Sequence, residues 1–343
     1  MKKQELSTKN RVLAILLTQP GVYFSGDSLA QSLDLSRESI WKAVRSLKAD
    51  GHQIASRKKA GYAYLRSQQV DALVLNQWLH LLGSDLAENQ QPTVQVFEQI
   101  GSTQAYAKDM VAKQPLIRPA LLIAREQSGG YGRQGRAFYS PKGRGLYVSL
   151  AMPVPVGTQL APSLLTTSAA VALVQGLQTF FPAAPFQLKW VNDLILHDHK
   201  IGGVITEGIF DFESQQYSAV ILGFAINLMP GAFPDGLESK AGTVLADGEA
   251  DLDLNVILAQ LVVNLLKMAD NYQSGAYLPA YRELSLLIGH TITVKVGTDE
   301  KTGIVTGISD QGGLIMVEDA TGQQQTLYAG EVTKVKLLEN LNL

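Results

Sequence analysis

A short loop at residues 128–136, with the sequence SGGYGRQGR, combines four glycines with two arginines. Glycine lets the main chain approach a ligand closely and adopt conformations that other residues resist. Arginine is permanently charged, and its fork of donors matches a phosphate or a carboxylate. An apolar, strand-like run at 120–124 precedes the loop and would hold one of its ends. The pattern indicates a loop that closes over an anionic ligand. A surface turn with incidental charges is the alternative.

Polar residues also interrupt an apolar, strand-like stretch at 186–196. Lys189, Asn192 and Asp193 would be costly to bury there unless they were paired or faced a ligand. A structural ion pair between Lys189 and Asp193 is one interpretation, and a ligand-facing cluster is the other. The small polar residues at 101–104 lie at a predicted strand-to-helix junction, where free amides suit a ligand's polar atoms. Helix capping is the alternative role for this junction.

Several kinds of chemistry are excluded by what the sequence lacks. There is no cysteine, so disulfides, thiolate metal sites and cysteine nucleophiles are excluded. Neither a Gly-x-Ser-x-Gly elbow nor a Walker-type phosphate loop occurs. His197 and His199 invite a metal-binding interpretation, which we reject because a solvated hairpin tip between two strands explains them. The sequence therefore predicts no metal-binding residues.

Length and composition are those of an ordinary globular protein. The chain has 343 residues, enough for two or three domains, with 46% hydrophobic and 17% charged residues. No run approaches the roughly 18 apolar residues of a membrane span, and no signal core follows the N-terminus. We therefore expect a cytoplasmic protein without a membrane partner. Residues 1–66 hold 12 Lys and Arg against 5 Asp and Glu, whereas the remainder holds 17 against 26. Only the basic first part is expected to meet a polyanion.

This basic part has the order helix, helix, turn, helix and basic hairpin. Apolar periodicity predicts a helix at 8–17 and two more after Ser25 and Ser36, whose hydroxyls suit helix N-caps. Strand-like runs follow at 53–56 and 62–65. This order resembles a winged helix-turn-helix, in which the long cationic helix enters the major groove and the hairpin contacts backbone phosphates.

Eight residues of this module are predicted to contact DNA. Side chains on the long helix are better placed to read bases, and those of the hairpin to contact phosphates. They are Arg37, Ser39, Trp41, Lys42 and Arg45 on the helix, and Arg57, Lys58 and Lys59 in the hairpin. A solvated basic helix in a protein-interaction module is the alternative. DNA binding is favoured because charge, turn and hairpin coincide.

The rest of the chain predicts further units, so the fold class is multidomain α+β. Long apolar helices are expected at 160–180 and 251–271, among strands of a mixed α/β domain. A helix at 277–287 precedes short strands with glycine turns, which are typical of a small β-barrel. The four predicted units are a winged helix-turn-helix, a helical connector, the α/β domain and the barrel, over residues 1–66, 67–92, 93–274 and 275–343.

Five short motifs along the chain together carry its resemblance to a known family. They are the Gly-Arg-rich loop, Gly101-Ser102-Thr103-Gln104, Lys189-Trp190-Val191-Asn192-Asp193, Lys200-Ile201-Gly202-Gly203 and Gly223-Phe224-Ala225-Ile226-Asn227. Their order resembles that of the biotin protein ligases, and the basic module makes the chain similar to the bifunctional members that also repress transcription. The C-terminal strands resemble the SH3-like domain of the same ligases.

This resemblance implies an activity and a set of partners. The chain would join biotin to ATP, with Mg²⁺, as biotinyl-5′-AMP and release pyrophosphate. It would then transfer biotin to a lysine of a biotin carboxyl carrier protein or domain of a carboxylase. The adenylate-bound chain would form a homodimer and bind operator DNA.

By position, the resemblance also assigns residues to each substrate. The biotin-binding residues would be Ser102, Thr103, Gln104, Gln127, Tyr131, Gly132, Arg133 and Lys189. The residues for ATP and the adenylate would be Arg133, Arg136, Phe138, Lys189, Asn192, Lys200, Ala225, Ile226 and Asn227. The implied catalytic residues are Lys189 and Arg133, which would lower the repulsion between two anions, and Asp193, which would orient or deprotonate the acceptor lysine.

The chain departs from the family's pattern at four positions: it has Gly101 for a usual aspartate, Tyr131 and Gln134 for common arginines, and Val191 for a usual proline. Lys189 and Arg133 are retained, so ligase activity is expected. Two alternatives stay open. One is a DNA-binding biotin sensor with a weakened ligase site, which the changes at 101 and 131 motivate. The other is a lipoate-type ligase, whose Arg-Arg-x-x-Gly-Gly-Gly-like loop does not occur here.

Overall fold

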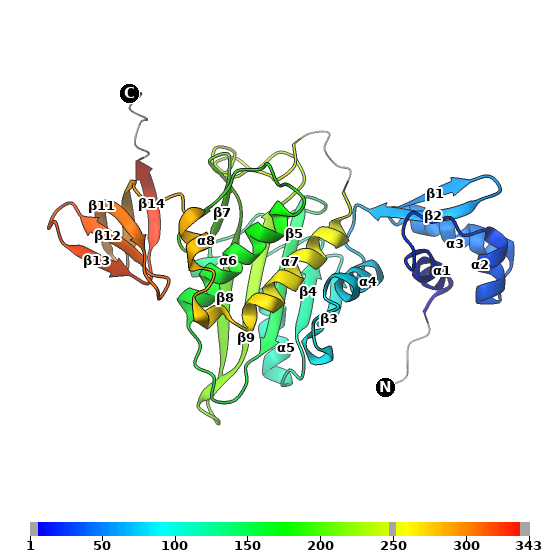
Figure 1. The fold of residues 1–343 in the computed structure, drawn as a ribbon, viewed down its shortest axis with the longest axis horizontal. Helices are drawn as coiled ribbons and strands as arrows, with labels where there is room; N and C mark the ends of the chain where they lie inside the picture. The colour runs from blue at the N-terminus through cyan, green and yellow to red at the C-terminus, as the bar shows by residue number, and fades with distance from the viewer. Residues whose placement is uncertain (1–5, 247–251, 337–343) are drawn as a thin grey trace.

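Three bodies of secondary structure follow one another along the molecule's long axis in the computed structural model (Figure 1). The structure describes residues 6–246 and 252–336. The described residues do not include the outer ends of the predicted units 1–66 and 275–343. They also do not include residue 251, at the start of a predicted helix. The boundaries of the four units stay predictions. No helix within the described ranges is long and apolar enough to cross a bilayer.

The N-terminal body has the predicted order of elements. It consists of α1 (Thr8–Leu16), α2 (Gly26–Leu33), α3 (Arg37–Ala49), β1 (His52–Arg57) and β2 (Gly61–Ser67). The Ser25 and Ser36 hydroxyls accept hydrogen bonds from the amides of Ser28 and Ser39, so both predicted N-caps are confirmed. Between α2 and α3 the chain turns at Asp34, which has a left-handed φ of 53°. The helices bury one apolar core, which includes Val12, Leu16, Ile40, Val44 and Leu47.

Polar contacts join this body to the central domain. The hydroxyl of Tyr64, on β2, donates to the carboxylate of Asp253 at 2.6 Å. Asp253 also caps α7 (Leu254–Ala269), and Asn255 of that helix accepts from the amide of Asp71 at 2.8 Å. Asp71 caps the connector helix α4 (Ala72–Leu82), which packs against α7. The connector and the wing are therefore each bonded to the start of α7 in the central domain.

The central domain is built on one seven-stranded sheet in the order β3-β4-β5-β9-β8-β7-β6. Only β3 and β4 are parallel neighbours, and the other pairs are antiparallel. Helices α6 (Pro162–Gln178) and α7 lie across one face (Figure 1), where they share a core with strand residues such as Leu150 and Leu222. The strands are β3 (Thr93–Phe97), β4 (Ala120–Ala124), β5 (Gly145–Pro153), β6 (Phe186–Lys189), β7 (Asp193–Leu196), β8 (His199–Asp211) and β9 (Gln216–Asn227).

The opposite face is only partly covered, by α5 (Thr103–Lys113). Ala151 of β5 and Ile221 of β9 pack with this helix. Because side chains on a strand alternate between faces, the residues two positions further along point to the same side. These are Ser149 and Gly223, which are partners in the sheet. Near the N-terminal end of α5, this face of the sheet lines a cavity.

The stretch at 186–196 is not the single strand that the sequence predicts. It forms two antiparallel strands, β6 and β7, joined by a tight turn. Trp190 and Val191 are buried in the turn, and the Asn192 side-chain amide donates to the carbonyl of Val204 at 2.7 Å. The polar residues thus lie where the chain reverses. The next reversal, at His197 and Asp198, has φ values of 48° and 63°, which confirms the predicted hairpin tip.

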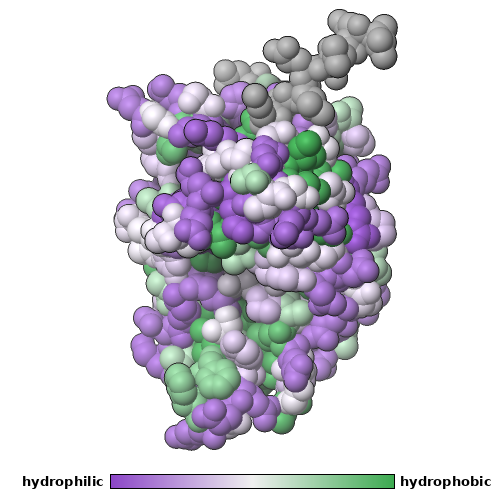
Figure 2. Space-filling view, turned by 90° about the vertical axis from the view of Figure 1, so that its left-hand side faces the viewer, coloured by the Kyte–Doolittle hydropathy of each residue, from purple (hydrophilic) through white to green (hydrophobic). Residues whose placement is uncertain are grey.

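The C-terminal body is a five-stranded antiparallel sheet in the order β13-β12-β11-β10-β14. Its strands are β10 (Thr291–Val296), β11 (Asp299–Ile308), β12 (Leu314–Glu318), β13 (Gln324–Leu327) and β14 (Glu331–Lys336). Its inward side buries Val294, Val305 and Met316, and the face seen end-on in Figure 2 is largely hydrophilic. Closure of this sheet into a barrel stays a prediction.

The helix predicted at 277–287 is shorter, since α8 spans Leu278–Glu283. The chain then becomes extended and binds the edge of the central sheet. The amide of Leu188 donates to Leu284, and the amide of Leu286 donates to Leu188. Here the chain forms these two hydrogen bonds in place of helical ones. They cover the otherwise exposed edge of β6.

Candidate active site

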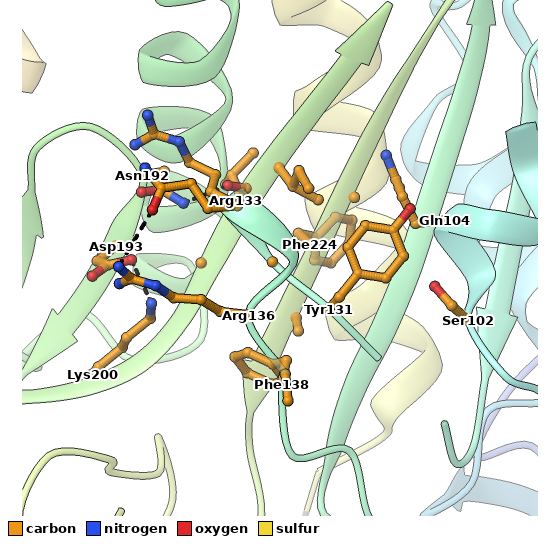
Figure 3. Close-up of a pocket in the computed structure, with 18 of the residues that line it drawn as sticks. Ser102, Gln104, Tyr131, Arg133, Arg136, Phe138, Asn192, Asp193, Lys200 and Phe224 are labelled. Carbon is orange, nitrogen blue, oxygen red and sulfur yellow. Dashed lines mark hydrogen bonds and ion pairs between the residues drawn. The ribbon is translucent and has the colours of Figure 1, made fainter. Parts of the chain in front are cut away.

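A pocket opens on the part of the central sheet that α5 leaves uncovered (Figure 3). It contains every residue assigned to biotin and most of those assigned to ATP. The predicted residues that line it are Ser102, Thr103, Gln104, Gln127, Tyr131, Gly132, Arg133, Arg136, Phe138, Lys189, Asn192, Asp193, Lys200 and Ala225. Residues up to 230 positions apart in sequence thus converge on one cavity, as Ser102 and Val332 do.

Two predicted ATP-site residues, Ile226 and Asn227, lie outside this lining. Ile226 alternates with Ala225 on β9, so its fully buried side chain packs in the core on the helical face. Asn227 is also buried, and its side-chain amide donates to the carbonyl of Gly242 at 3.2 Å. Of the Gly-Phe-Ala-Ile-Asn motif, the pocket is lined by the residues from Gly223 to Ala225.

One end of the pocket is a preformed hydrogen-bond network. The Gln127 side-chain oxygen accepts from the Thr103 amide at 2.9 Å and from the Thr103 hydroxyl at 3.1 Å. The Ser149 hydroxyl lies 2.9 Å from both Thr103 Oγ1 and Gln104 Oε1. Ser102 caps α5 by accepting from the Ala105 amide, so the capping interpretation is also confirmed. These contacts fix hydroxyl and amide groups before any ligand arrives.

Ser149 is a pocket residue that sequence reasoning missed. It is fully buried in the middle of β5 and lines the cavity. The available signal was a hydroxyl residue inside an otherwise apolar strand, since a buried polar group requires a partner. Gly330, Glu331 and Val332 were missed as well, and they form a wall that comes from the C-terminal body.

The floor of the pocket requires glycine at position 223. A Cβ atom there would lie 2.5 Å from Gln104 Oε1 and 2.6 Å from Ile205 Cγ2. Both distances are shorter than van der Waals contact, so a larger residue would displace Gln104 from the network. The bare backbone at Gly223 therefore keeps the sheet surface open to a ligand.

The Gly-Arg-rich loop folds over the pocket as a narrow curl. The Phe138 amide donates to the Gly130 carbonyl at 2.8 Å, and the Gly132 amide donates to the Arg136 carbonyl at the same distance. At its centre, Arg133–Gly135 form a short 3₁₀ turn. Figure 3 shows Arg133 and Arg136 on the side of the pocket where Asn192 and Asp193 lie.

Positive charge gathers at that side. Asp193 bonds to Lys200 Nζ at 2.6 Å, so it does not form the Lys189–Asp193 ion pair that was one interpretation of the sequence. Burial lowers the pKa of Lys189 and of Arg133, although the carboxylate of Asp193 opposes the shift in both. Among the residues that the structure describes, neither cation forms an ion pair. An arriving anion would therefore find two desolvated cations without competing partners.

The loop is also bonded to the C-terminal body. The Arg136 guanidinium donates to both carboxylate oxygens of Glu331, on β14. This hydrogen bonding lowers the pKa of Glu331 below its usual range. The contact closes the pocket between two bodies that are far apart in the sequence.

Three family models match successive parts of the chain. They are the HTH domain over residues 8–63, the Biotin/lipoate A/B protein ligase family over 96–227, and the Biotin protein ligase C terminal domain over 287–335. The Biotin--[acetyl-CoA-carboxylase] ligase of Paracoccus denitrificans is 32% identical over 224 residues, which cover 62% of this chain and 89% of that protein. The chain belongs to the biotin protein ligase family.

The family's bifunctional members match over nearly the whole length. The Bifunctional ligase/repressor BirA of Bacillus subtilis is 26% identical over 321 residues, covering 90% of this chain and 94% of that protein. The fold agrees with a solved structure, the biotin protein ligase from Aquifex aeolicus in complex with biotin and ATP. That structure has a TM-score of 0.59 and 22% identity, and the match covers 71% of this chain and 98% of that one. The chain is thus a ligase/repressor of the BirA type in its three-part architecture.

The helix-turn-helix of this biotin protein ligase presents only some of its predicted DNA contacts freely. Arg37 donates to both oxygens of Asp27 on α2, and Lys42 bonds to Glu38 at 2.7 Å. Trp41 is 49% exposed, and the Arg45 guanidinium lies 5.5 Å from the centroid of its ring.

The other predicted contacts divide between helix and wing. The amide of Ser39 is used in the α3 cap. In the wing, Arg57, Lys58 and Lys59 are exposed around the turn between β1 and β2. Of the predicted DNA contacts, the Trp41–Arg45 pair on α3 and the three basic residues of the wing are therefore the most available to DNA.

Proposed function

We propose that this chain is an ATP-dependent biotin–protein ligase that also represses transcription. It activates biotin as biotinyl-5′-AMP and transfers it to a lysine of a biotin carboxyl carrier protein or carboxylase domain. One observation carries the proposal: within a family fold, one pocket joins a network of hydroxyl and amide groups to two partly buried cations that form no ion pair with any residue the structure describes.

The network end suits the head group of biotin. A ureido group has two N–H donors and one carbonyl acceptor, so it needs neutral partners of both kinds. The side chains of Thr103, Gln104 and Gln127 offer such partners, and Ser149 holds the first two in place. Tyr131 and Gly132 would then cover the bound ring system from the loop.

The cationic end suits the reacting anions. In adenylation, a biotin carboxylate oxygen attacks the α-phosphorus of ATP, and the bond to the pyrophosphate leaving group breaks. Lys189 and Arg133 reduce the repulsion between the two anions and stabilise the charge that develops at phosphorus. The curl of the loop excludes water from the mixed anhydride, which water would otherwise hydrolyse.

Mg²⁺ belongs to this proposal only as the ion that accompanies ATP. No group of three or more His, Asp or Glu side chains that could hold a metal occurs in the described part of the chain. Asp193 and Glu331, the carboxylates of the pocket, are each bonded to a cation, Lys200 and Arg136 respectively. The phosphates and water would supply most ligands to the ion, as is usual for Mg²⁺.

In the second step, the acceptor lysine attacks the acyl carbon of the adenylate, an amide forms and AMP leaves. The attacking amine must be neutral. Asp193 is the pocket carboxylate proposed to orient this amine or to accept its proton, and its bond to Lys200 holds the carboxylate in place.

Repression adds two proposals to the enzyme. The adenylate-bound chain forms a homodimer, and the paired helix-turn-helix modules bind a palindromic operator in the cytoplasm. The palindrome follows from the symmetry of a dimer. Operator affinity measured with and without biotin and ATP tests this switch, and equal affinities would remove it.

The ligase proposal is tested with purified protein, biotin and Mg-ATP. Biotinyl-5′-AMP and pyrophosphate should form, and an added carrier domain should gain one biotin by mass spectrometry. Absence of both products would reject the ligase and, if operator binding still responded to biotin, would favour a sensor. Preferential use of lipoate in a competition would favour a lipoate-type ligase.

A further inference from the structure

Three side chains from different elements meet beside the Gly-Arg-rich loop. Lys108 lies on α5, Tyr131 in the loop and Glu207 on β8. Lys108 Nζ bonds to one carboxylate oxygen of Glu207 at 2.9 Å, and the Tyr131 hydroxyl donates to the other oxygen at 3.3 Å. Lys108 Nζ also lies 5.2 Å from the centroid of the Tyr131 ring. Each member of this latch thus contacts the other two.

The latch connects the Gly-Arg-rich loop to the central sheet and to α5. Glu207 is in the middle of the long β8–β9 pair, and Lys108 is in the middle of α5. Tyr131 lines the pocket, and in Figure 3 its ring lies on the side where Ser102 and Gln104 are found. A cation over an aromatic face and a carboxylate at the hydroxyl together define both the tilt and the depth of the ring.

Neither Lys108 nor Glu207 lines the pocket. A direct role in either chemical step is therefore not available to them. Their charges are also nearly balanced between themselves, so the pair adds little net charge to the site. What they can affect is the position of Tyr131, and through it how long the loop stays closed over a ligand.

We propose that Lys108 and Glu207 are positioning residues that hold the loop closed through Tyr131 and so slow the escape of the bound adenylate. The inference rests on the proposed function, because the ligand retained is the product of the first step. In the ligand-free protein, the same two residues would hold the loop to the sheet and the helix before biotin arrives. Retention of the adenylate then depends on two residues outside the pocket.

The test compares Lys108→Met with Lys108→Arg, Glu207→Gln and a matched control. Lys113→Met removes the same charge from an exposed position on the same helix. Labelled biotinyl-5′-AMP is bound to each full-length variant and chased with unlabelled adenylate. Lys108→Met and Glu207→Gln should release it about fivefold to tenfold faster, as the loss of one partly buried cation–π or ionic contact predicts. Lys108→Arg should restore slow release, and Lys113→Met should match the unmodified chain.

A second readout does not depend on catalysis. Trypsin cleavage after Arg133 and Arg136 reports opening of the loop in the ligand-free protein. Cleavage should be faster in Lys108→Met than in Lys113→Met. The two variants should have equal melting temperatures. Equal release and equal cleavage in the two variants would overturn the latch. If the unmodified chain bound no adenylate, the proposed function would fail, and the cleavage comparison would still decide the latch.

Discussion

Replacing Lys189 with methionine separates what this residue does for stability from what it does for chemistry. Lys189 is partly buried at the end of β6, and burial lowers its pKa. Lys200 lowers the pKa further, whereas Asp193 opposes the shift but is bonded to Lys200. The folded protein therefore holds this cation at a cost that the nearby carboxylates offset only in part, and an incoming anion would compensate further for the lost water.

Methionine matches the length of the lysine stem and carries no charge. Because a poorly compensated charge is removed from a partly buried position, the melting temperature of Lys189→Met should stay the same or rise. The rate of adenylate formation should fall by about 10²–10³, which is the usual cost of about 3–4 kcal/mol for removing one donor aimed at developing charge. Lys189→Arg keeps the charge and should lose less activity.

The assay is single-turnover formation of biotinyl-5′-AMP at saturating biotin and Mg-ATP, followed by thermal unfolding of the same samples. We expect a lower rate constant together with a melting temperature that is unchanged or higher. A large drop in melting temperature would show that Lys189 is a structural residue. An unchanged rate constant would show that Arg133 alone neutralises the reacting anions, and the assignment of Lys189 would be wrong.

Three further predictions follow from contacts in the structure. Gly223→Ala should raise the KM for biotin and destabilise the fold by about 1–3 kcal/mol, because its Cβ would lie 2.5 Å from Gln104 Oε1; an unchanged KM would show that the floor can relax. The pKa of Glu331 is lowered by its bond to Arg136, so the contact stabilises the loop above the unfolded pKa of about 4.3 and is lost as the pH falls through the lower folded value. Opening of the loop, measured by hydrogen exchange of its amides corrected for the intrinsic pH dependence, should therefore increase on acidification in the unmodified chain, and Glu331→Gln, which lacks the ion pair at every pH, should show no such change. Lys58→Ala should weaken binding to all DNA sequences alike and reduce the slope of log affinity against log salt by about one, measured by titration at several salt concentrations; a change in sequence preference would instead place Lys58 against a base.

Local features of this fold were predictable because their causes lie within a few residues. Ser25 and Ser36 cap helices as expected, since an N-cap needs only a hydroxyl beside the first free amides. The reversal at His197 was predictable from polar residues between two apolar runs. The stretch at 186–196 was misread because periodicity does not reveal a tight turn whose residues are buried, as Trp190 is.

The sequence by itself determined which residue types the site contains and the order in which they occur along the chain. The glycines and arginines of the loop, the hydroxyl and amide residues at 102–104, and Lys189 could be recognised because residue type limits the chemistry available. The resemblance to biotin protein ligases rests on that order, and the family comparisons confirm it.

Only the tertiary structure decided which of these groups are free and which are paired. Asp193 binds Lys200 rather than its strand partner Lys189, and Glu331 reaches Arg136 from the far end of the chain. Such pairings depend on distances between elements that are remote in sequence, and the energy of a charge depends on burial and neighbours that no local pattern records. For the loop at 128–136, the sequence predicts anion binding, and the structure adds its contacts with Glu207 of β8 and Glu331 of β14.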